Sequence, residues 1–272
     1  MSSTMLGDHL SFTQLSSACE CPYGYFLQKI IGVEPTPNAF SQSGSLAHEI
    51  IADWAKGIIP IKQLAVQWIQ RFPQEVTSEF PSFLAAKGYK ERFFDSVLSY
   101  FENFDGFPGF EVVGAEQEFS SSLAGEKFVG VIDLILRDEK TGNLMLVDHK
   151  SASLSSFKRN KDKMYKQLLL YSKYCADTYG SFPQTLCFNL FKEGILDQRP
   201  FDSESYISAR VWAENMIETM KNYDITDWMQ TRPELFRCTQ LCNCRSECLF
   251  GIAENHKRKE NIYGVKHTPA VA

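Results

Sequence analysis

The sequence predicts a mixed α/β fold in which a small mixed sheet is flanked by helices. Three observations support this prediction. The first part of the chain repeats apolar residues at helical spacing, a run of extended segments follows it, and helix and strand signals then alternate through the rest of the body. Proline and glycine separate the segments, and the sequence has no internal repeat.

Helices are expected over the first hundred residues. Ser11 and Gln14 have the spacing of a capping box, and apolar residues continue at helical spacing to Ile31, with a disturbance at Pro22. This pattern fits two short helices as well as one kinked helix. Further helices are expected at 43–56, 61–72 and 87–104, separated by prolines and glycines.

After residue 109 the period of the pattern changes from helical to extended. Strands are expected at 111–121, 127–137 and 143–150, and their short turns indicate an antiparallel meander. The remaining elements expected are a helix at 161–179 that ends at Gly180, strands at 185–192 and 196–201, and a helix at 203–223. We expect one integrated domain with three parts: a helical section at 1–108, a sheet-bearing core at 109–225, and a Cys-rich end and tail at 226–272.

The size and charge of the chain fit a globular enzyme. It has 272 residues, 44% of them hydrophobic, and a net charge of −5 from 28 Lys plus Arg and 33 Asp plus Glu. No apolar run reaches the roughly 18 to 20 residues of a membrane span, and the start lacks a secretory pattern, so we expect a cytoplasmic protein. The mild acidity argues against coating nucleic acid by general basic charge but allows a local basic groove.

Two carboxylates occupy unusual positions in the strand segments. Asp133 lies in an apolar strand, and strand alternation places Asp148 and Lys150 on one face of a later strand, with His149 on the other. If the strands are neighbours, Asp133 and Asp148 converge. Converging carboxylates hold hard cations such as Mg²⁺ or Mn²⁺, and a nearby ammonium can orient water, which suits phosphodiester hydrolysis. Alone, Asp133 is as well explained by a salt bridge, and an Asp-x-Lys tripeptide is common by chance.

Weaker candidates lie on neighbouring elements. Gln167 and Tyr171 share one face of the helix expected at 161–179, although a half-exposed helix face is the better explanation of this pair taken alone. His48 lies on an early helix, where a single histidine is usually structural. Glu116 and Glu118 lie on the same face of the first expected strand, where ordinary solvation would also explain them.

The eight cysteines are bunched. Cys238, Cys242, Cys244 and Cys248 lie near the end of the chain, and Cys21 lies near its start. In a reducing compartment such a group indicates metal ligation before disulfides. Thiolates suit zinc or an iron–sulfur cluster, and the two Cys-x-x-Cys knuckles typical of zinc ribbons are absent. Ordinary buried thiols are the alternative, and the better one for Cys19, Cys175 and Cys187.

The combined pattern resembles the RecB-like branch of the PD-(D/E)XK nuclease superfamily. The motif reads Gly-x-Ile-Asp133, fourteen residues, Asp148-His-Lys150, sixteen residues and Gln167-x-x-x-Tyr171, after a histidine on an early helix. The resemblance implies a restriction-endonuclease-like core at 109–225. Many relatives have Glu where this chain has Asp148.

The resemblance also implies roles for single residues. His48, Asp133 and Asp148 would bind Mg²⁺ or Mn²⁺, one or two ions, with the main-chain carbonyl of His149 as a further ligand. Lys150 would be catalytic. Gln167 and Tyr171 would support the site and contact the nucleic-acid strand, and the Glu-x-x-Phe pattern of the first strand gives Glu116 a supporting role.

The cysteines resemble an iron–sulfur branch of the same superfamily, which includes AddB-type and CRISPR adaptation nucleases. The resemblance implies that Cys21, Cys238, Cys242 and Cys248 hold a structural 4Fe-4S cluster, with zinc as the alternative. Three residues separate Cys238 from Cys242 where two are common, so Cys244 competes for the place of Cys238.

We therefore expect a metal-dependent DNA nuclease, in the first place an exonuclease. Its substrates would be single-stranded DNA or duplex ends, its context DNA repair, recombination or phage and CRISPR-type processing, with a recombination or helicase partner and no membrane. The alternatives are an endonuclease, an RNA nuclease, a zinc-stabilised interaction protein and a non-catalytic DNA-binding scaffold. Basic residues at 158–166 are candidates for contact with the phosphate backbone.

Overall fold

The computed structural model describes residues 6–232, 234 and 236–249. The part of the predicted Cys-rich end that follows residue 249 lies outside these residues. Within them, no helix has both the length and the apolar character that crossing a membrane requires.

A five-stranded sheet forms the centre of the molecule, with its strands in the order β1-β2-β3-β4-β5. They are β1 (Phe110–Leu123), β2 (Glu126–Asp138), β3 (Leu144–His149), β4 (Thr185–Leu190) and β5 (Ile195–Pro200). The first three form the predicted antiparallel meander. Because a long helix connects β3 to β4, these two strands run parallel, while β5 returns antiparallel to β4. The mixed sheet is therefore confirmed.

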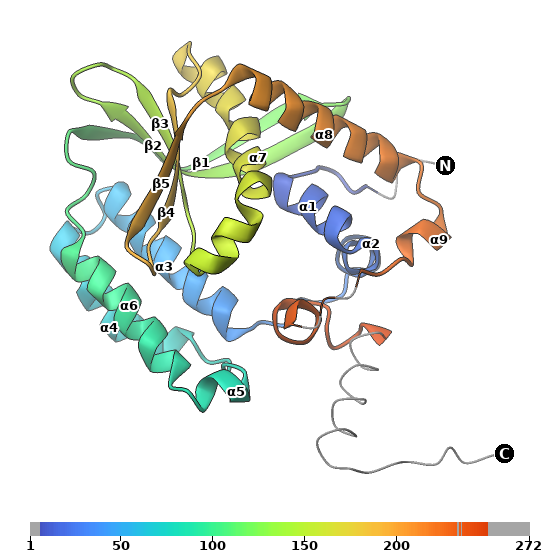
Figure 1. Cartoon of the computed structure of the whole chain (residues 1–272), viewed down its shortest axis with the longest axis horizontal. Coiled ribbons are helices and arrows are strands. Elements are labelled where there is room, and N and C mark those ends of the chain that lie inside the picture. The colour runs from blue at the N-terminus through green and yellow to red at the C-terminus, as the bar shows by residue number, and fades with distance from the viewer. Residues whose placement is uncertain (1–5, 233, 235, 250–272) are drawn as a thin grey trace.

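Helices cover both faces of this sheet (Figure 1). On one face lie α1 (Phe12–Glu20), α7 (Leu154–Tyr179) and α8 (Ser203–Lys221), and their core includes Leu144 and Leu146 of β3. On the other face lie α3 (Ala39–Ala55), α4 (Leu64–Glu75) and α6 (Tyr89–Asn103), and there Met145 and Val147 of β3 are buried. Strand β3 is buried on both faces, which explains its nearly continuous apolar sequence.

Several helix boundaries differ from those expected. Helix α7 starts at Leu154 rather than 161, because the side chain of Ser153 accepts a hydrogen bond from the main-chain N–H of Ser156 and begins the helix earlier. Helix α3 starts at Ala39, behind a capping box at Asn38. The short helices not expected are α5 (Ser82–Ala85) and α9 (Ile225–Trp228), whereas the start of the helix expected at 61–72 forms the single 3-10 turn η2 (Ile61–Gln63) before α4.

The amino-terminal segment breaks at Cys21, which ends α1 and caps α2 (Pro22–Tyr25). The π-helix η1 (Phe26–Ile31) continues from α2. Of the two alternatives expected here, the structure has the short helices separated by a break and not the single kinked helix. A second π-helix, η3 (Arg237–Leu241), lies near the other end of the chain.

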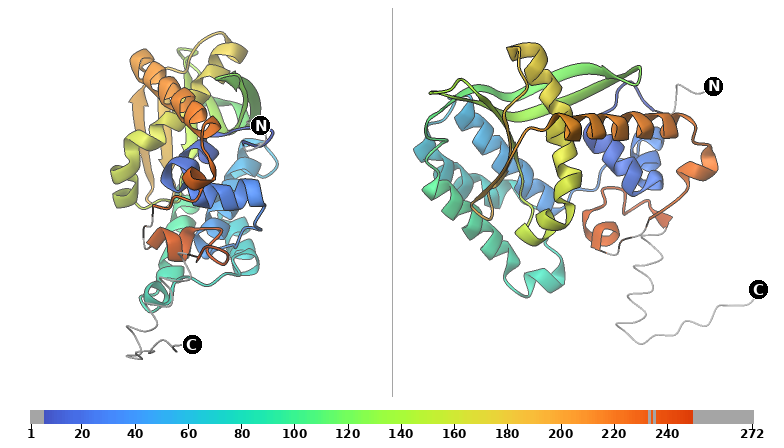
Figure 2. Two further views of the ribbon diagram at one scale, coloured as in Figure 1. Left: turned by 90° about the vertical axis from the view of Figure 1, so that its right-hand side faces the viewer. Right: turned by 45° about the horizontal axis from the view of Figure 1, so that its top comes forward.

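The two ends of the described chain lie side by side, as both views in Figure 2 show for the blue and orange-red segments. The main-chain N–H of Tyr23 donates to Gln230, and that of Thr36 donates to Asn243, at 3.0 and 2.7 Å. The Arg237 guanidinium also binds the carboxylate of Glu20 at 2.8 Å. The Cys-rich end is thus held against the first helices.

Candidate active site

The two predicted acids meet at neighbouring positions of β2 and β3. Leu134 pairs with Val147, which places Asp133 and Asp148 at the next position along the two strands. Oδ2 of Asp133 accepts a hydrogen bond of 2.7 Å from the main-chain N–H of His149. The convergence that strand alternation predicts therefore occurs, and the backbone of β3 holds one acid in place.

Lys150 lies just beyond β3, beside the second acid. Its Nζ is 2.6 Å from Oδ2 of Asp148 and donates to Oε1 of Gln167 at 3.3 Å. Burial raises the pKa of Asp148, while the Lys150 ammonium opposes that effect. Oδ2 of Asp148 is buried, and among the described residues its contact is the Lys150 ammonium.

His48 and Glu116 complete the predicted group from two further elements. Nδ1 of His48, on α3, lies 3.4 Å from Oδ2 of Asp133. His48 and Glu116 line a cavity of about 420 Å³ together with Asp133 and Lys56. Burial, followed by the charge of Asp133, raises the pKa of Glu116. The cavity thus gathers His48, Asp133 and Glu116 from α3, β2 and β1.

The predicted shared face of Glu116 and Glu118 is wrong. Glu116 has a φ of 48°, in the left-handed region, and this interrupts the alternation of β1. Glu116 consequently lines the cavity beside Asp133, whereas Glu118 lines a separate pocket on the side of α1. A strained conformation in a non-glycine residue is a feature that strand periodicity cannot reveal.

His149 faces away from Lys150, toward α6. Its side chain is 2% exposed, and burial lowers its pKa to about 3, so the ring is neutral. Nδ2 of Asn189, on β4, lies 3.0 Å from Nδ1 of His149 and donates to the Tyr100 hydroxyl oxygen at 2.6 Å. Neither Asn189 nor Tyr100 was among the residues predicted from the sequence. The signal for Asn189 was the one that identified Asp133, namely a polar residue inside an apolar strand.

Gln167 and Tyr171 lie on α7, against the other face of the meander. Burial, and after it the charge of Asp148, raise the pKa of Tyr171. Tyr171 and Phe119 pack edge to face at a centroid distance of 5.0 Å, across Gly130. A Cβ added to Gly130 would lie 2.6 Å from Cε1 of Phe119 and 2.8 Å from Cζ of Tyr171. The glycine of the motif is therefore required by the packing of two rings.

A hard divalent cation fits these residues by the chemistry of their donors. The carboxylates of Asp133 and Asp148 are oxygen ligands, and Oδ2 of Asp148 is a buried acceptor whose partner is the Lys150 ammonium at 2.6 Å. In the described residues, no three His, Cys, Asp or Glu side chains already form a metal-binding group. The acids instead contact the side chains of His48 and Lys150, so a cation would compete with these two side chains for the carboxylates.

The structure brings most of the terminal cysteines together. Cys21, Cys242, Cys244 and Cys248 pack with Tyr23 and Leu27. Burial, and after it the charges of Cys248 and Cys238, raise the pKa of Cys242, so Cys238 on η3 is also close. All eight cysteines are free, and Cys175 and Cys187 are buried in the main core, away from this group.

Much of the basic run at 158–166 is already paired. Lys161 binds Asp197 at 2.8 Å, Lys163 forms an ion pair with Glu20, and Nζ of Lys166 lies 4.6 Å from the ring centroid of Trp212. These three cations have partners within the protein, which weakens the prediction that the run contacts phosphates.

A family model matches this chain, and two solved structures are similar to it. A model of the PD-(D/E)XK nuclease superfamily matches residues 9–249. Among solved structures, a candidate exonuclease from Eubacterium rectale is similar, at 13% identity and a TM-score of 0.46, over 99% of this chain and 93% of that one. The structure of SSO0001 is similar at 12% identity and a TM-score of 0.37, over 90% of this chain and 87% of that one. No curated protein matches. The family match spans both acids, Lys150, Gln167 and Tyr171, and the chain therefore belongs to the PD-(D/E)XK nuclease superfamily, the phosphodiester-hydrolysing family that its sequence motifs resemble.

Proposed function

We propose that this nuclease is a divalent-metal-dependent deoxyribonuclease that degrades DNA from strand ends. The observation that carries the proposal is the contact of Lys150 with both Asp148 and Gln167, next to the hydrogen bond between Asp133 and His149. The Lys150 ammonium is held between the acid Asp148 and the neutral amide of Gln167. In this position it would lie beside a phosphate bound at the two acids and beside the attacking water.

In this proposal His48, Asp133, Asp148 and the carbonyl of His149 would hold one or two Mg²⁺ or Mn²⁺ ions. A bound cation would polarise the phosphoryl oxygen and lower the pKa of water. Lys150 places its ammonium beside the attacking water and the developing charge, and Gln167 limits the positions that the ammonium can take. Glu116, whose pKa is raised, is a supporting group that can hold a proton near the acids.

The test of catalysis compares Lys150→Ala with Lys62→Ala, an exposed lysine outside the site. The substrates are 5′- and 3′-labelled single-stranded and duplex DNA with Mn²⁺, and the protein is purified without oxygen. We expect Lys150→Ala to lose at least about 100-fold in rate, and Lys62→Ala to keep the normal rate. Full activity of Lys150→Ala would contradict the assigned role of this lysine.

The same assay separates the remaining alternatives. Products that shorten from a labelled end, with closed circular DNA left intact, support the exonuclease. Cleavage of circles would identify an endonuclease, and preference for RNA would identify an RNA nuclease. Binding of DNA without any product, at every divalent metal, would favour a non-catalytic scaffold.

We further propose that Cys21, Cys238, Cys242 and Cys248 hold a 4Fe-4S cluster that fastens the two ends of the chain together. Support comes from the packing of three of these residues in one group and from the charge of Cys238 beside Cys242. The π-helix η3 accounts for the unusual spacing, because its Cys242 N–H bonds to Arg237, five residues back, and such a turn accommodates one extra residue.

Cys244 is the competing ligand, but its environment differs. It is fully buried, and its Sγ donates to the main-chain oxygen of Gly24 at 3.8 Å. A thiol that donates in this way retains its proton, whereas a cluster ligand is a thiolate. We therefore propose that Cys244 packs beneath the ligands. The recombination or helicase partner and a cytoplasmic location remain part of this proposed role.

A further inference from the structure

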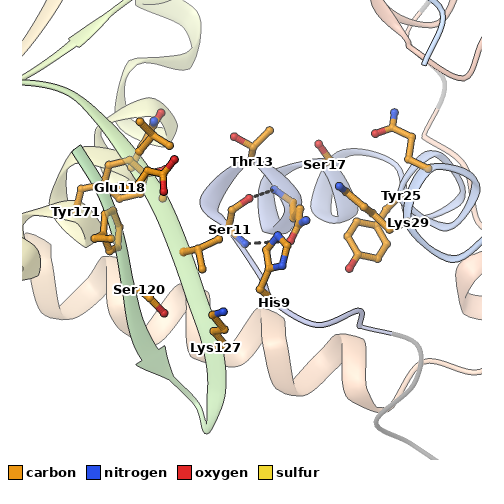
Figure 3. A pocket seen from close by; sticks show the side chains of 17 residues that line it. His9, Ser11, Thr13, Ser17, Tyr25, Lys29, Glu118, Ser120, Lys127 and Tyr171 are labelled. Carbon is orange, nitrogen blue, oxygen red and sulfur yellow. Dashed lines mark hydrogen bonds between the residues drawn. The ribbon is translucent and has the colours of Figure 1, made fainter. Parts of the chain in front are cut away.

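A pocket of about 960 Å³ adjoins the proposed catalytic group on the side of α1. In Figure 3, the strands carrying Glu118, Ser120 and Lys127 lie on one side of it and helix α1, with Thr13 and Ser17, lies on the other. Gln167 and Tyr171 of α7 also line it. The first helices of the chain, the β1–β2 hairpin and α7 thus enclose one concave surface.

A residue that lines this pocket is hydrogen-bonded to Lys150, the proposed catalytic lysine. Gln167 lines the pocket and accepts the bond from Nζ of Lys150. Lys150 in turn contacts Asp148 at 2.6 Å. A chain whose scissile phosphate lay at Asp148 would therefore pass Gln167 and enter this pocket.

The charge of the pocket suits a phosphate backbone. Lys29 and Lys127 line it and are exposed, and neither forms an ion pair within residues 6–249 where the structure is described. Lysines such as Lys161 and Lys163, by contrast, are neutralised by carboxylates. Glu118 is the single carboxylate of the lining, so two cations face one anion.

The uncharged lining suits sugars and bases. Thr13 and Ser17 lie one helical turn apart on α1, so both hydroxyls line the same wall. Val131, which is 42% exposed, and Phe119 supply apolar surface on the strands. The volume is within the range of roughly 300–1,000 Å³ that pockets for small ligands have, so it fits a few nucleotides of one strand.

We propose that this pocket binds the single-stranded segment of DNA next to the scissile phosphate. Lys29 and Lys127 contact its phosphates, and Thr13 and Ser17 contact its backbone. This inference rests on the proposed deoxyribonuclease function. It assigns substrate recognition to the first helices of the chain, and it makes a single strand, or the frayed end of a duplex, the form that is bound.

The test measures binding of a fluorescein-labelled 12-nucleotide single strand by anisotropy over a series of salt concentrations, with Ca²⁺ in place of Mg²⁺ to preserve the probe. The variant Lys29→Ala/Lys127→Ala is compared with Lys62→Ala/Lys87→Ala, which removes the same charge from exposed lysines outside the pocket. We expect roughly tenfold weaker binding for the first pair only. Its slope of log K against log salt should be shallower by about 1.4, since each phosphate contact contributes about 0.7.

A steric variant supplies an independent measurement. Thr13→Trp fills the pocket from an exposed helix position, so we expect a folded protein, verified by circular dichroism, with weakened strand binding. A blunt 12-base-pair duplex should compete at least tenfold less well than the single strand. The inference is overturned if both lysine pairs weaken binding alike, if Thr13→Trp binds normally, or if the duplex competes equally.

These outcomes are separable from failure of the proposed function. If no metal supports cleavage but binding changes as expected, the pocket stands and the catalytic proposal fails. If DNA is cleaved normally while the two lysine pairs bind alike, the catalytic proposal stands and the pocket fails.

Discussion

The main-chain N–H of His149 donates a 2.7 Å hydrogen bond to Oδ2 of Asp133. This bond connects the backbone between Asp148 and Lys150 to the acid of the neighbouring strand. Since the side chain of His149 is itself held by Asn189, the positions of the two acids depend on β2, β3 and β4 together. The candidate site is therefore fixed mainly by backbone and buried amide contacts.

Asp133→Asn and Asp133→Ala should separate catalysis from structure. Both variants lose the charge, so we expect at least about 100-fold slower cleavage in each. Asn retains an oxygen that can accept from His149, whereas Ala leaves a buried N–H unpaired, so Asp133→Ala should unfold more easily by about 1–3 kcal/mol. Urea denaturation and single-turnover cleavage check this, with the exposed Glu111→Gln of β1 as the unaffected control. Normal cleavage by Asp133→Asn would remove Asp133 from the site.

Asn189→Leu should impair catalysis through His149. The substitution removes the amide that contacts both the His149 ring and the Tyr100 hydroxyl, and we expect about tenfold lower activity with a higher Mn²⁺ requirement. Tyr100→Phe is the matched control, because it removes one hydrogen bond of Asn189 and leaves the contact with His149. Metal titrations of the cleavage rate distinguish the two. Equal Mn²⁺ requirements in both variants would mean that Asn189 only stabilises the fold.

Gly130→Ala should destabilise the protein through overpacking. The added methyl group would meet Phe119 and Tyr171 at 2.6 to 2.8 Å, which costs about 1–3 kcal/mol of unfolding free energy. In a Phe119→Ala background the same substitution should cost less, because two of the three closest atoms belong to Phe119. Urea denaturation of the four proteins measures this coupling, and strict additivity would show that Phe119 does not confine residue 130.

Single Cys→Ser variants, purified without oxygen, should identify the cluster ligands. Iron content and visible absorbance should fall in Cys21→Ser, Cys238→Ser, Cys242→Ser and Cys248→Ser. We expect Cys244→Ser to keep its iron, because the thiol of Cys244 donates to Gly24, and the buried Cys187→Ser serves as the control. Loss of iron in Cys244→Ser with retention in Cys238→Ser would exchange their roles. If metal analysis of the unsubstituted protein found zinc and no iron, the proposed site would be a zinc site and not a 4Fe-4S cluster.

The mixed fold and the pair of acids could be predicted from the order of residues alone. Alternation along β2 and β3 identified the faces of Asp133 and Asp148, and short turns required these strands to be neighbours, so both conclusions needed only local geometry. The start of α7 was missed, since the cap at Ser153 lies in a polar segment without hydrophobic period.

The groups that surround the acids became known from the packing of the folded chain. The closeness of Glu116 to His48, the contact of Asn189 with His149 and the pocket between α1 and the β1–β2 hairpin all depend on elements far apart in the sequence. A spacing pattern records distances along one element. It does not contain the packing of separate elements, which alone sets the closeness of side chains and the partners that neutralise a lysine.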